Sequence, residues 1–238
     1  MAVAGVGSSR LRWERYAWAG GVLYVVALVI EAVISVGVKA NQNDSAAKIA
    51  GELADHHRRL VLVACFSILY ALGFAIYLAR LHALLRGDSR LPRFLGTWVL
   101  IGGVLFLTLH AVSDVGITGM LGAKVATYSA QHDQGVGYTL YLLTFALDSV
   151  GDVFGSLFAL ATGLLLLERR LLPRWLGWTA VLVSPLFVVQ AFGLGGVIST
   201  FGLVVDLIGF LLLVIFVLAS SLVFLRRDPL AQGTPALG

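Results

Sequence analysis

The sequence predicts an all-α integral membrane protein, a bundle of six transmembrane helices. Of its 238 residues, 59% are hydrophobic and 13% are charged, whereas a soluble domain carries roughly 25% charged residues. The mean hydropathy is +0.92. Six apolar runs each come close to or exceed the ~20 residues that a helix needs to cross the hydrocarbon core. The net charge is +4. The arginines cluster in short connections between the apolar runs, where orientation in the membrane explains them, so this charge gives no indication of nucleic-acid binding.

The predicted spans, in chain order, are Tyr16–Val38, Leu60–Leu81, Phe94–Asp114, Tyr141–Leu167, Trp175–Leu194 and Thr200–Leu225. The fourth run can begin as early as Val136, and it is long enough to tilt or to project beyond the bilayer. Residues 1–15 then form a cytoplasmic N-terminal segment, and residues 16–227 form the transmembrane domain. The tail, residues 228–238, contains Pro, Gly and Thr and is expected to be a disordered cytoplasmic segment.

Basic residues predict the orientation of the bundle. Twelve of the seventeen Lys and Arg residues precede the first span, fill the second and fourth connections, or end the sixth span. The opposite side holds Lys39, Lys48, Arg58, Arg59 and Lys124. By the positive-inside rule, both termini are predicted to be cytoplasmic.

The outer connection before the second span and the outer connection after the third span are longer than the inner connections. Asn41–His57 contains a predicted short helix, because Asp44 or Ser45 can cap it and apolar residues recur within it at helical spacing. We expect this helix to lie at the interface or to cover the bundle. Val115–Gly137 is glycine-rich and polar and is expected to connect two spans outside the membrane.

A motif occurs twice in the predicted bundle. Pro92-Arg93-Phe94-Leu95-Gly96 opens the third span, and Pro173-Arg174-Trp175-Leu176-Gly177 opens the fifth. Proline in a first helical turn loses no needed hydrogen bond, and the aromatic residue anchors the interface. Spans two and three therefore resemble spans four and five, which predicts a duplicated hairpin.

Ionisable side chains lie inside the apolar runs, although a charge in hydrocarbon costs at least ~2.5–3.5 kcal/mol. Counting ~1.5 Å per residue places them about 22 to 30 Å from the cytoplasmic edge, in the outer half of the membrane or at its outer rim. We expect them to form one polar pocket with catalytic roles. They are Glu31, His110, Asp114, Asp148, Asp152 and Asp206.

Two pairs among these residues have helical spacing. His110 and Asp114 are four residues apart, as are Asp148 and Asp152, so each pair shares one helix face. Two buried carboxyl groups this close disfavour simultaneous ionisation. One of them is therefore expected to be protonated near neutral pH and able to act as a general acid.

The predicted binding residues of the pocket are aromatic, amide and basic. In an acidic cavity, aromatic rings stabilise a cation by cation–π attraction. The predicted set is Phe106, Tyr141, Phe145, Phe154, Gln190, Arg58 and Arg59. Simpler readings stay open: Glu31 can pair with Arg58 or Arg59 to fix packing, and Asp114, Asp148 and Asp206 can lie at wet helix ends.

Four classes of function fit this inventory. The first is an intramembrane enzyme that uses acid–base chemistry on an apolar, isoprenoid substrate, without cofactor or metal. The second is a proton- or cation-coupled transporter, against which the scarcity of polar residues in the inner half counts. The third is metal-dependent lipid hydrolysis, which the single intramembrane histidine, His110, disfavours. The fourth is a non-catalytic accessory or assembly protein. Membrane lipids are the expected surroundings in each case.

Two resemblances accompany these observations. The basic connections and the segment Leu-Leu-Pro-Arg-Trp-Leu-Gly-Trp at residues 171–178 resemble an uncharacterised family of six-helix bacterial membrane proteins. That resemblance implies a fold and no activity. In size, spans and intramembrane acids, the chain also looks like the small membrane-bound terpene cyclases. Its Ala-, Gly-, Leu-, Val- and Arg-rich composition suggests an actinobacterial source and a location in the bacterial cell membrane.

Overall fold

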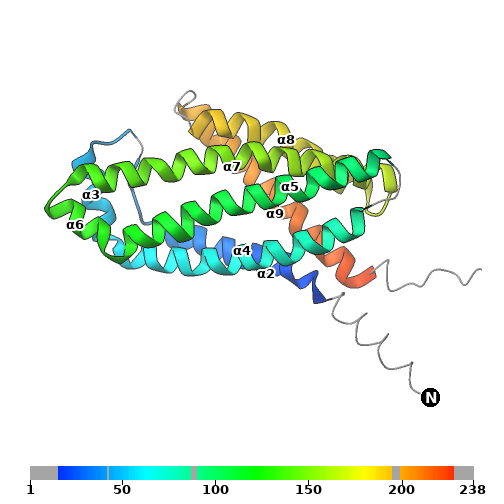
Figure 1. Cartoon of the computed structure of the whole chain (residues 1–238), viewed down its shortest axis with the longest axis horizontal. Coiled ribbons are helices and arrows are strands. Elements are labelled where there is room, and N and C mark those ends of the chain that lie inside the picture. The colour runs from blue at the N-terminus through cyan, green and yellow to red at the C-terminus, as the bar shows by residue number, and fades with distance from the viewer. Residues whose placement is uncertain (1–15, 42, 87–89, 195–198, 228–238) are drawn as a thin grey trace, which may run out of the picture.

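A computed structural model describes residues 16–41, 43–86, 90–194 and 199–227 (Figure 1). Side-chain surroundings are described for these residues except 90–91, 193–194, 199–204, 206 and 227. In the described part of the chain every regular element is helical. The predicted N-terminal segment and the predicted tail lie outside the described residues.

The described helices follow the order of the predicted spans. They are α2 (Ala19–Ser35), α3 (Ala46–Asp55), α4 (His57–Leu85), α5 (Arg90–Ala111), the π-helical segments η1 (Val112–Thr118) and η2 (Leu121–Val125), α6 (Ala126–Gln131), α7 (Gln134–Arg169), α8 (Arg174–Leu194) and α9 (Ser199–Arg227). Among the described residues, five stretches are long and apolar enough to cross a membrane: His57–Leu85, Pro92–Gln131, Gln134–Arg169, Arg174–Phe192 and Leu207–Arg226. The apolar helix α2 is shorter, with 17 residues.

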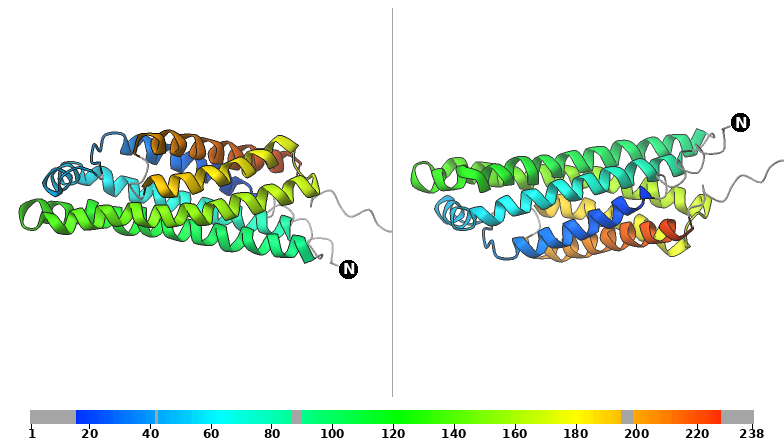
Figure 2. Two further views of the ribbon diagram at one scale, coloured as in Figure 1. Left: turned by 90° about the horizontal axis from the view of Figure 1, so that it is seen from above. Right: turned by 90° about the horizontal axis from the view of Figure 1, so that it is seen from below.

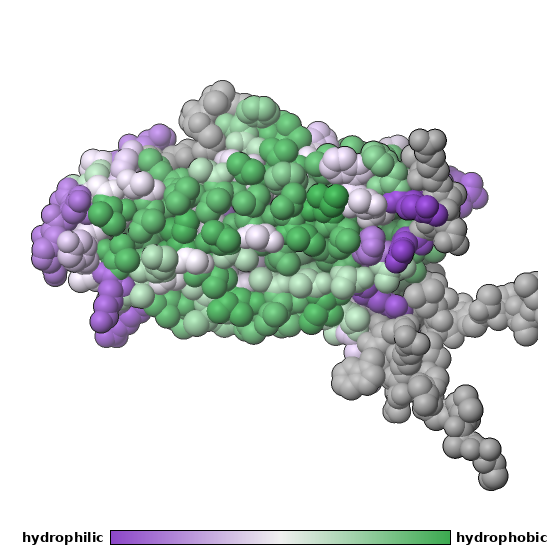
Figure 3. Space-filling model, in the orientation of Figure 1, coloured by the Kyte–Doolittle hydropathy of each residue, from purple (hydrophilic) through white to green (hydrophobic). Residues whose placement is uncertain are grey.

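Successive long helices are neighbours and form a closed ring. α2 packs on α4, α4 on α5, α5 on α7, α7 on α8 and α8 on α9, and α9 returns to α2. Figure 2 shows these helices running along one common axis. On the face shown in Figure 3, the surface between the two ends is mainly apolar, and hydrophilic residues gather at the ends. This distribution is the one expected of a multi-pass membrane protein.

The third span extends beyond its predicted end. Instead of stopping at Asp114 and giving way to a glycine-rich connection, the chain stays helical from Pro92 to Gln131. Forty residues of helix are about 60 Å long, roughly twice the hydrocarbon core. The glycines do not break the helix because one of them permits close packing: a Cβ on Gly122 would lie 2.6 Å from the backbone nitrogen of Val61 in α4.

The predicted short helix in the first outer connection is present as α3. The side chain of its N-cap residue, Ser45, accepts a hydrogen bond from the backbone N–H of Lys48. The Lys48 ammonium donates to Asp44 at 2.8 Å and holds the pKa of that carboxyl group below its usual value. Ile49 and Leu53 are buried in a small cluster with η1, η2 and α6. α3 therefore covers one end of the bundle (Figure 1).

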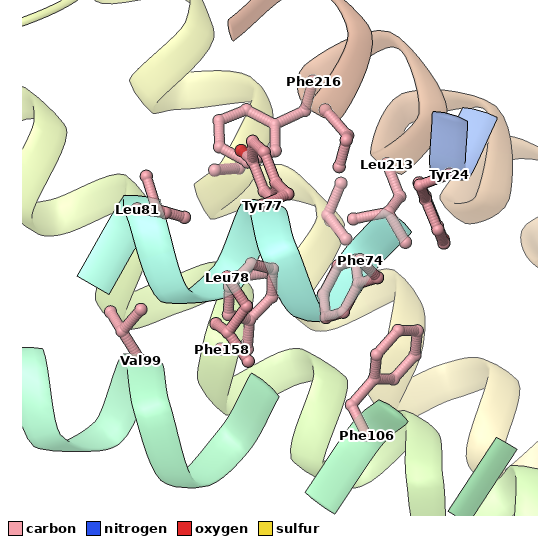
Figure 4. Packing of buried hydrophobic residues seen from close by; sticks show 14 of the residues in the cluster. Tyr24, Phe74, Tyr77, Leu78, Leu81, Val99, Phe106, Phe158, Leu213 and Phe216 are labelled. Carbon is pink, nitrogen blue, oxygen red and sulfur yellow. The ribbon is translucent and has the colours of Figure 1, made fainter. Parts of the chain in front are cut away.

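An aromatic core fills the ring on the side away from α3. Phe74 of α4 is fully buried, and its ring centroid lies 5.1 to 6.1 Å from those of Tyr24, Tyr77, Phe106 and Phe158 (Figure 4). These four rings come from α2, α4, α5 and α7. Because the rings interlock at edge-to-face and tilted angles, the core fixes the helices that carry the polar residues described below.

Candidate functional site

A cavity of about 370 Å³ lies inside the ring of helices. Each of the six long helices contributes to its wall, and Tyr24 and Phe106 belong both to the wall and to the aromatic core. The volume falls within the ~300–1,000 Å³ that small-molecule sites occupy. The titratable side chains among the described wall residues are Tyr24, Glu31, Tyr70, His110, Asp114, Asp148 and Asp152.

His110 and Asp152 form a pair across α5 and α7. The Nε2 atom of His110 lies 3.5 Å from Oδ1 of Asp152. The Nδ1 atom lies 2.9 Å from the carbonyl oxygen of Phe106, so Nδ1–H is the donor there. Nε2 is then the nitrogen that gains or loses a proton. The pair can hold a proton either on the imidazole or on the carboxyl group.

Gly151 creates the space for this pair. A Cβ atom at this position would lie 2.6 Å from both Cε1 and Nδ1 of His110. The histidine ring therefore lies directly against the backbone of α7. Gly155, one turn further, accommodates the rings of Phe106 and Phe187 in the same way, because a Cβ atom there would lie 2.7 Å from a carbon of each ring.

Asp114 is held by a tyrosine from the neighbouring helix. The hydroxyl of Tyr70 in α4 donates a hydrogen bond to Oδ2 of Asp114. Asp114 belongs to η1, where the helix widens to the π form. Single π turns occur often at functional sites. Ser113 in the same segment donates to the carbonyl of Thr144 at 3.4 Å and so ties η1 to α7.

Three acceptor oxygens in the described wall have no hydrogen-bond partner. They are Oδ1 of Asp148, Oδ2 of Asp152 and Oε1 of Gln190, and all three are buried. Asp152 as a whole is 1% exposed. Buried polar groups in proteins are nearly always hydrogen-bonded, because an unmade bond costs about 1–3 kcal/mol. Four other buried polar atoms of the described residues also have no hydrogen-bond partner, on Trp18, Glu52, Thr162 and Ser221, and lie outside the cavity. The three in the wall are the ones whose residues lie beside a space that can hold a ligand.

The rest of the wall is aromatic and aliphatic. Phe106 lies with its ring centroid 4.4 Å from that of His110 and 5.8 Å from that of Phe187, with which it stacks. Phe145 and Phe210 also contribute to the wall. No Lys or Arg occurs among the described residues that line this cavity. Within that set the only nitrogen base is His110, which accompanies four carboxyl groups.

A family model described as a domain of unknown function, DUF4386, matches residues 19–225. The chain belongs to the DUF4386 family. The match confirms the expectation of an uncharacterised family that covers most of the chain. No curated protein and no solved structure matches the sequence.

In this DUF4386 protein most of the predicted acidic residues meet in one place. Glu31, His110, Asp114, Asp148 and Asp152 line the same cavity. The side chain of Asp206, predicted with them, lies outside the described residues. Among the predicted binding residues, Phe106, Phe145 and Gln190 line the cavity.

Four predicted binding residues do not line the cavity of the DUF4386 chain. Arg58 and Arg59 are exposed, and neither forms an ion pair with Glu31 among the described residues. The Arg59 guanidinium lies instead against Gly37. The Tyr141 hydroxyl donates to the carbonyl of Ala40 at 2.8 Å, outside the cavity. Phe154 packs against the aromatic core.

The structure also adds residues that the sequence patterns missed. Tyr24 and Tyr70 line the cavity with their ring centroids 6.0 Å apart, and Phe210 and Ser35 are also in its wall. A tyrosine inside an apolar run is ordinarily a packing residue, so no sequence signal marked Tyr70. In the described part of this DUF4386 chain, no three His, Cys, Asp or Glu side chains are arranged to hold a metal ion.

Proposed function

We propose that the chain is a membrane enzyme that performs acid–base chemistry on a lipid-soluble substrate in this cavity. The proposed reaction is the proton-initiated cyclisation of an isoprenoid. The observation that carries the proposal is the His110–Asp152 pair, which can hold a proton while Oδ2 of the buried Asp152 has no partner in the cavity. Such a carboxyl group has the reach and the surroundings of a general acid.

The reaction balances without a cofactor. Asp152 in its acid form gives its proton to one carbon of a double bond, and the other carbon becomes a carbocation. A second double bond attacks this cation and closes a ring through a new carbon–carbon bond. A carboxylate, Glu31 or Asp148, then removes a proton from the carbon beside the new cation and restores a double bond. The product is an isomer of the substrate, and the proton returns to Asp152 through the cavity's titratable groups.

The composition of the wall supports protonation as the way to start the reaction. The alternative, departure of a diphosphate group, requires positive charge to bind that group, either from Lys or Arg side chains or from a metal ion held by carboxylates. Among the described residues, no three His, Cys, Asp or Glu side chains are arranged to hold such an ion. The described wall contains neither Lys nor Arg. The rings of Phe106, Phe145 and Phe187 would stabilise a passing carbocation by cation–π attraction.

The unpartnered acceptors of the wall differ from polar groups that hold two helices together. Polar groups that only hold transmembrane helices together do so by pairing with one another. Tyr77 and Ser220 are an example, joined at 2.9 Å between α4 and α9. Asp148, Asp152 and Gln190 instead keep free acceptors beside a cavity.

We further propose that α2 is a sixth span, that both ends of the chain are cytoplasmic and that the protein is resident in a bacterial cell membrane. The clustering of Arg residues at one side supports this orientation. A duplicated hairpin is supported by two glycines of the repeated motif. Gly96 faces the end of α4 near Leu85, and Gly177 faces the end of α7 near Leu167.

The test compares organic extracts of a bacterial host by untargeted mass spectrometry. The host expresses the wild type, Asp152→Asn or the exposed-site control Asp55→Asn at matched membrane levels and is fed uncharged prenylated candidates. We expect a compound of unchanged mass and new retention time with the wild type and the control only. Identical extracts from all three, or the same product from Asp152→Asn, would overturn the proposal.

A further inference from the structure

We infer that the cavity is selective for an organic ammonium ion on an apolar body, and that the ammonium is bound by Asp148, Asp152 and Gln190. This goes beyond the proposed cyclisation, because it follows from the wall alone and applies equally to a binding protein or a transporter. The same three residues carry the buried acceptor oxygens that have no partner in the described wall.

The number and kind of unpartnered atoms match a primary ammonium group. Oδ1 of Asp148, Oδ2 of Asp152 and Oε1 of Gln190 are acceptors, and a primary ammonium carries three N–H donors and no acceptor. Asp148 and Asp152 lie one turn apart on α7, and Gln190 lies on the adjacent helix α8. A hydroxyl group has one donor and would leave two of these oxygens without a partner.

The charge of the wall selects for a cation. Glu31, Asp114, Asp148 and Asp152 supply four carboxyl groups, against a single histidine and no Lys or Arg among the described wall residues. A cation in this space would favour ionisation of the carboxyl groups beside it and pair with the carboxylates, whereas a bound carboxylate or phosphate would be repelled by them. The stacked rings of Phe106 and Phe187 add a face suited to a cation.

The size of the site distinguishes an organic cation from a bare metal ion. The cavity measures about 370 Å³ and much of its wall is apolar. The described His, Cys, Asp and Glu side chains do not converge in a group of three that could ligate an ion. A ligand with a small cationic head and a hydrocarbon body fits both the carboxyl groups and the apolar remainder of the wall.

The experiment measures binding of four probes with the same ten-carbon chain: decylamine, decyltrimethylammonium, decanol and decanoate. The full-length protein is reconstituted in zwitterionic-lipid nanodiscs, so that each probe enters the lipid equally for every variant. The shift in the thermal unfolding midpoint reports binding. We expect the largest shift with decylamine, a smaller one with decyltrimethylammonium, which has no N–H donor, and none with decanoate.

Two variants separate charge from hydrogen bonding. Asp148→Asn should weaken the binding of both cations. The affinity for decylamine should fall by roughly tenfold to a hundredfold, because a charge-assisted hydrogen bond is lost. Gln190→Leu should weaken the binding of decylamine and leave the binding of decyltrimethylammonium unchanged. This variant provides an independent test if the Asp148 variant does not fold. Asp55→Asn, an exposed carboxyl outside the cavity, should behave as the wild type.

Decanol binding as tightly as decylamine, or decylamine binding unaffected by Gln190→Leu, would overturn the inference. The outcome is separable from that of the proposed reaction. Selective ammonium binding without any wild-type product would leave the inference intact and remove the cyclisation. A wild-type product without selective ammonium binding would support the cyclisation and overturn the inference.

Discussion

At the scale of single residues, the cavity depends on side chains that hold the carboxyl groups in place. Tyr70 donates to Asp114, and the Phe106 carbonyl fixes the orientation of His110. The shared depth of Glu31 and the carboxyl groups of η1 and α7 follows from helical spacing, which sequence alone provides, whereas their convergence in one cavity is seen only in the structure. The contribution of Tyr70 does not follow from the sequence, because nothing on its own helix distinguishes it from a packing tyrosine.

The error at Arg58 and Arg59 also has a physical cause. Counting along the helix gives both residues the same depth as the acidic groups, and opposite charges favour pairing. In the structure both side chains are exposed. A long guanidinium side chain at a helix end reaches water more cheaply than it enters a cavity. Counting along a helix gives depth, but the direction of a flexible side chain is decided by solvation.

Replacing Tyr70 with Phe should test the support of Asp114. The variant removes the hydroxyl that donates to the buried carboxyl group and leaves that acceptor without its partner. We expect a loss of about 1–3 kcal/mol in unfolding free energy. Denaturant titration in detergent measures it, with Tyr128→Phe as the matched control on an exposed tyrosine. Equal stability of the two variants would contradict the assigned role.

Replacing Gly151 with Ala should displace His110 without unfolding the protein. The new methyl group would lie 2.6 Å from the imidazole ring, which is the mobile end of a side chain and can move aside. We expect stability to fall by about 1–3 kcal/mol and the histidine to lose its contact with Asp152. NMR of labelled histidine would detect a changed His110 signal, and an unchanged signal would show that the ring does not pack on α7.

At the scale of helices, the sequence predicted α3 and its cap correctly but ended the third span too early. Glycines and polar residues after Asp114 have the composition of a connection. The helix continues because Gly119 and Gly122 lie against α4 and because η1 and η2 pack on their neighbours. Tertiary packing overrides local propensity here, and a pattern read along one segment carries no information about that packing.

The crossing of α7 and α8 makes a prediction at this scale. A Cβ atom on Gly163 would lie 2.7 Å from the carbonyl oxygen of Gly177 and 2.8 Å from the backbone nitrogen of Val181. Because backbone atoms cannot rotate away, Gly163→Ala must separate the two helices. We expect a loss of about 1–3 kcal/mol in unfolding free energy, measured by denaturant titration in detergent.

The control for this helix crossing is Gly51→Ala. Gly51 lies within α3 and has no atom within 4 Å of a new methyl group. Since alanine favours helix over glycine, this control should be more stable than the wild type by up to about 1 kcal/mol. A Gly163 variant as stable as the Gly51 variant would contradict the close crossing of α7 and α8.

At the scale of the whole molecule, a ring of helices surrounds a cavity that is lined by carboxyl groups and apolar side chains, beside an aromatic core. The all-helical membrane character was predictable because hydropathy and length determine it. Neither the closure of the ring by α2 and α9 nor the cavity's place inside it was predictable, since no sequence pattern reports which faces meet.

The proposed orientation predicts which residues face the outside of the cell. Cys65 is the only cysteine of the chain, so a Cys65→Ser background accepts single labelling sites. An impermeant maleimide should label Gln131→Cys, at the tip between α6 and α7, in intact cells. It should label Glu168→Cys, near the end of α7, only after permeabilisation. The reverse pattern would contradict cytoplasmic termini.

The most direct test of the central claim, that a cavity carboxyl group starts the reaction by giving up a proton, is a deuterium experiment. Purified wild-type protein and the Asp152→Asn variant would be incubated with uncharged acyclic isoprenoids in heavy water and the products analysed by mass spectrometry. We predict a cyclic isomer from the wild type that carries one deuterium from the solvent, and none from the variant. A product without solvent deuterium, or no product from any isoprenoid tested, would contradict the claim.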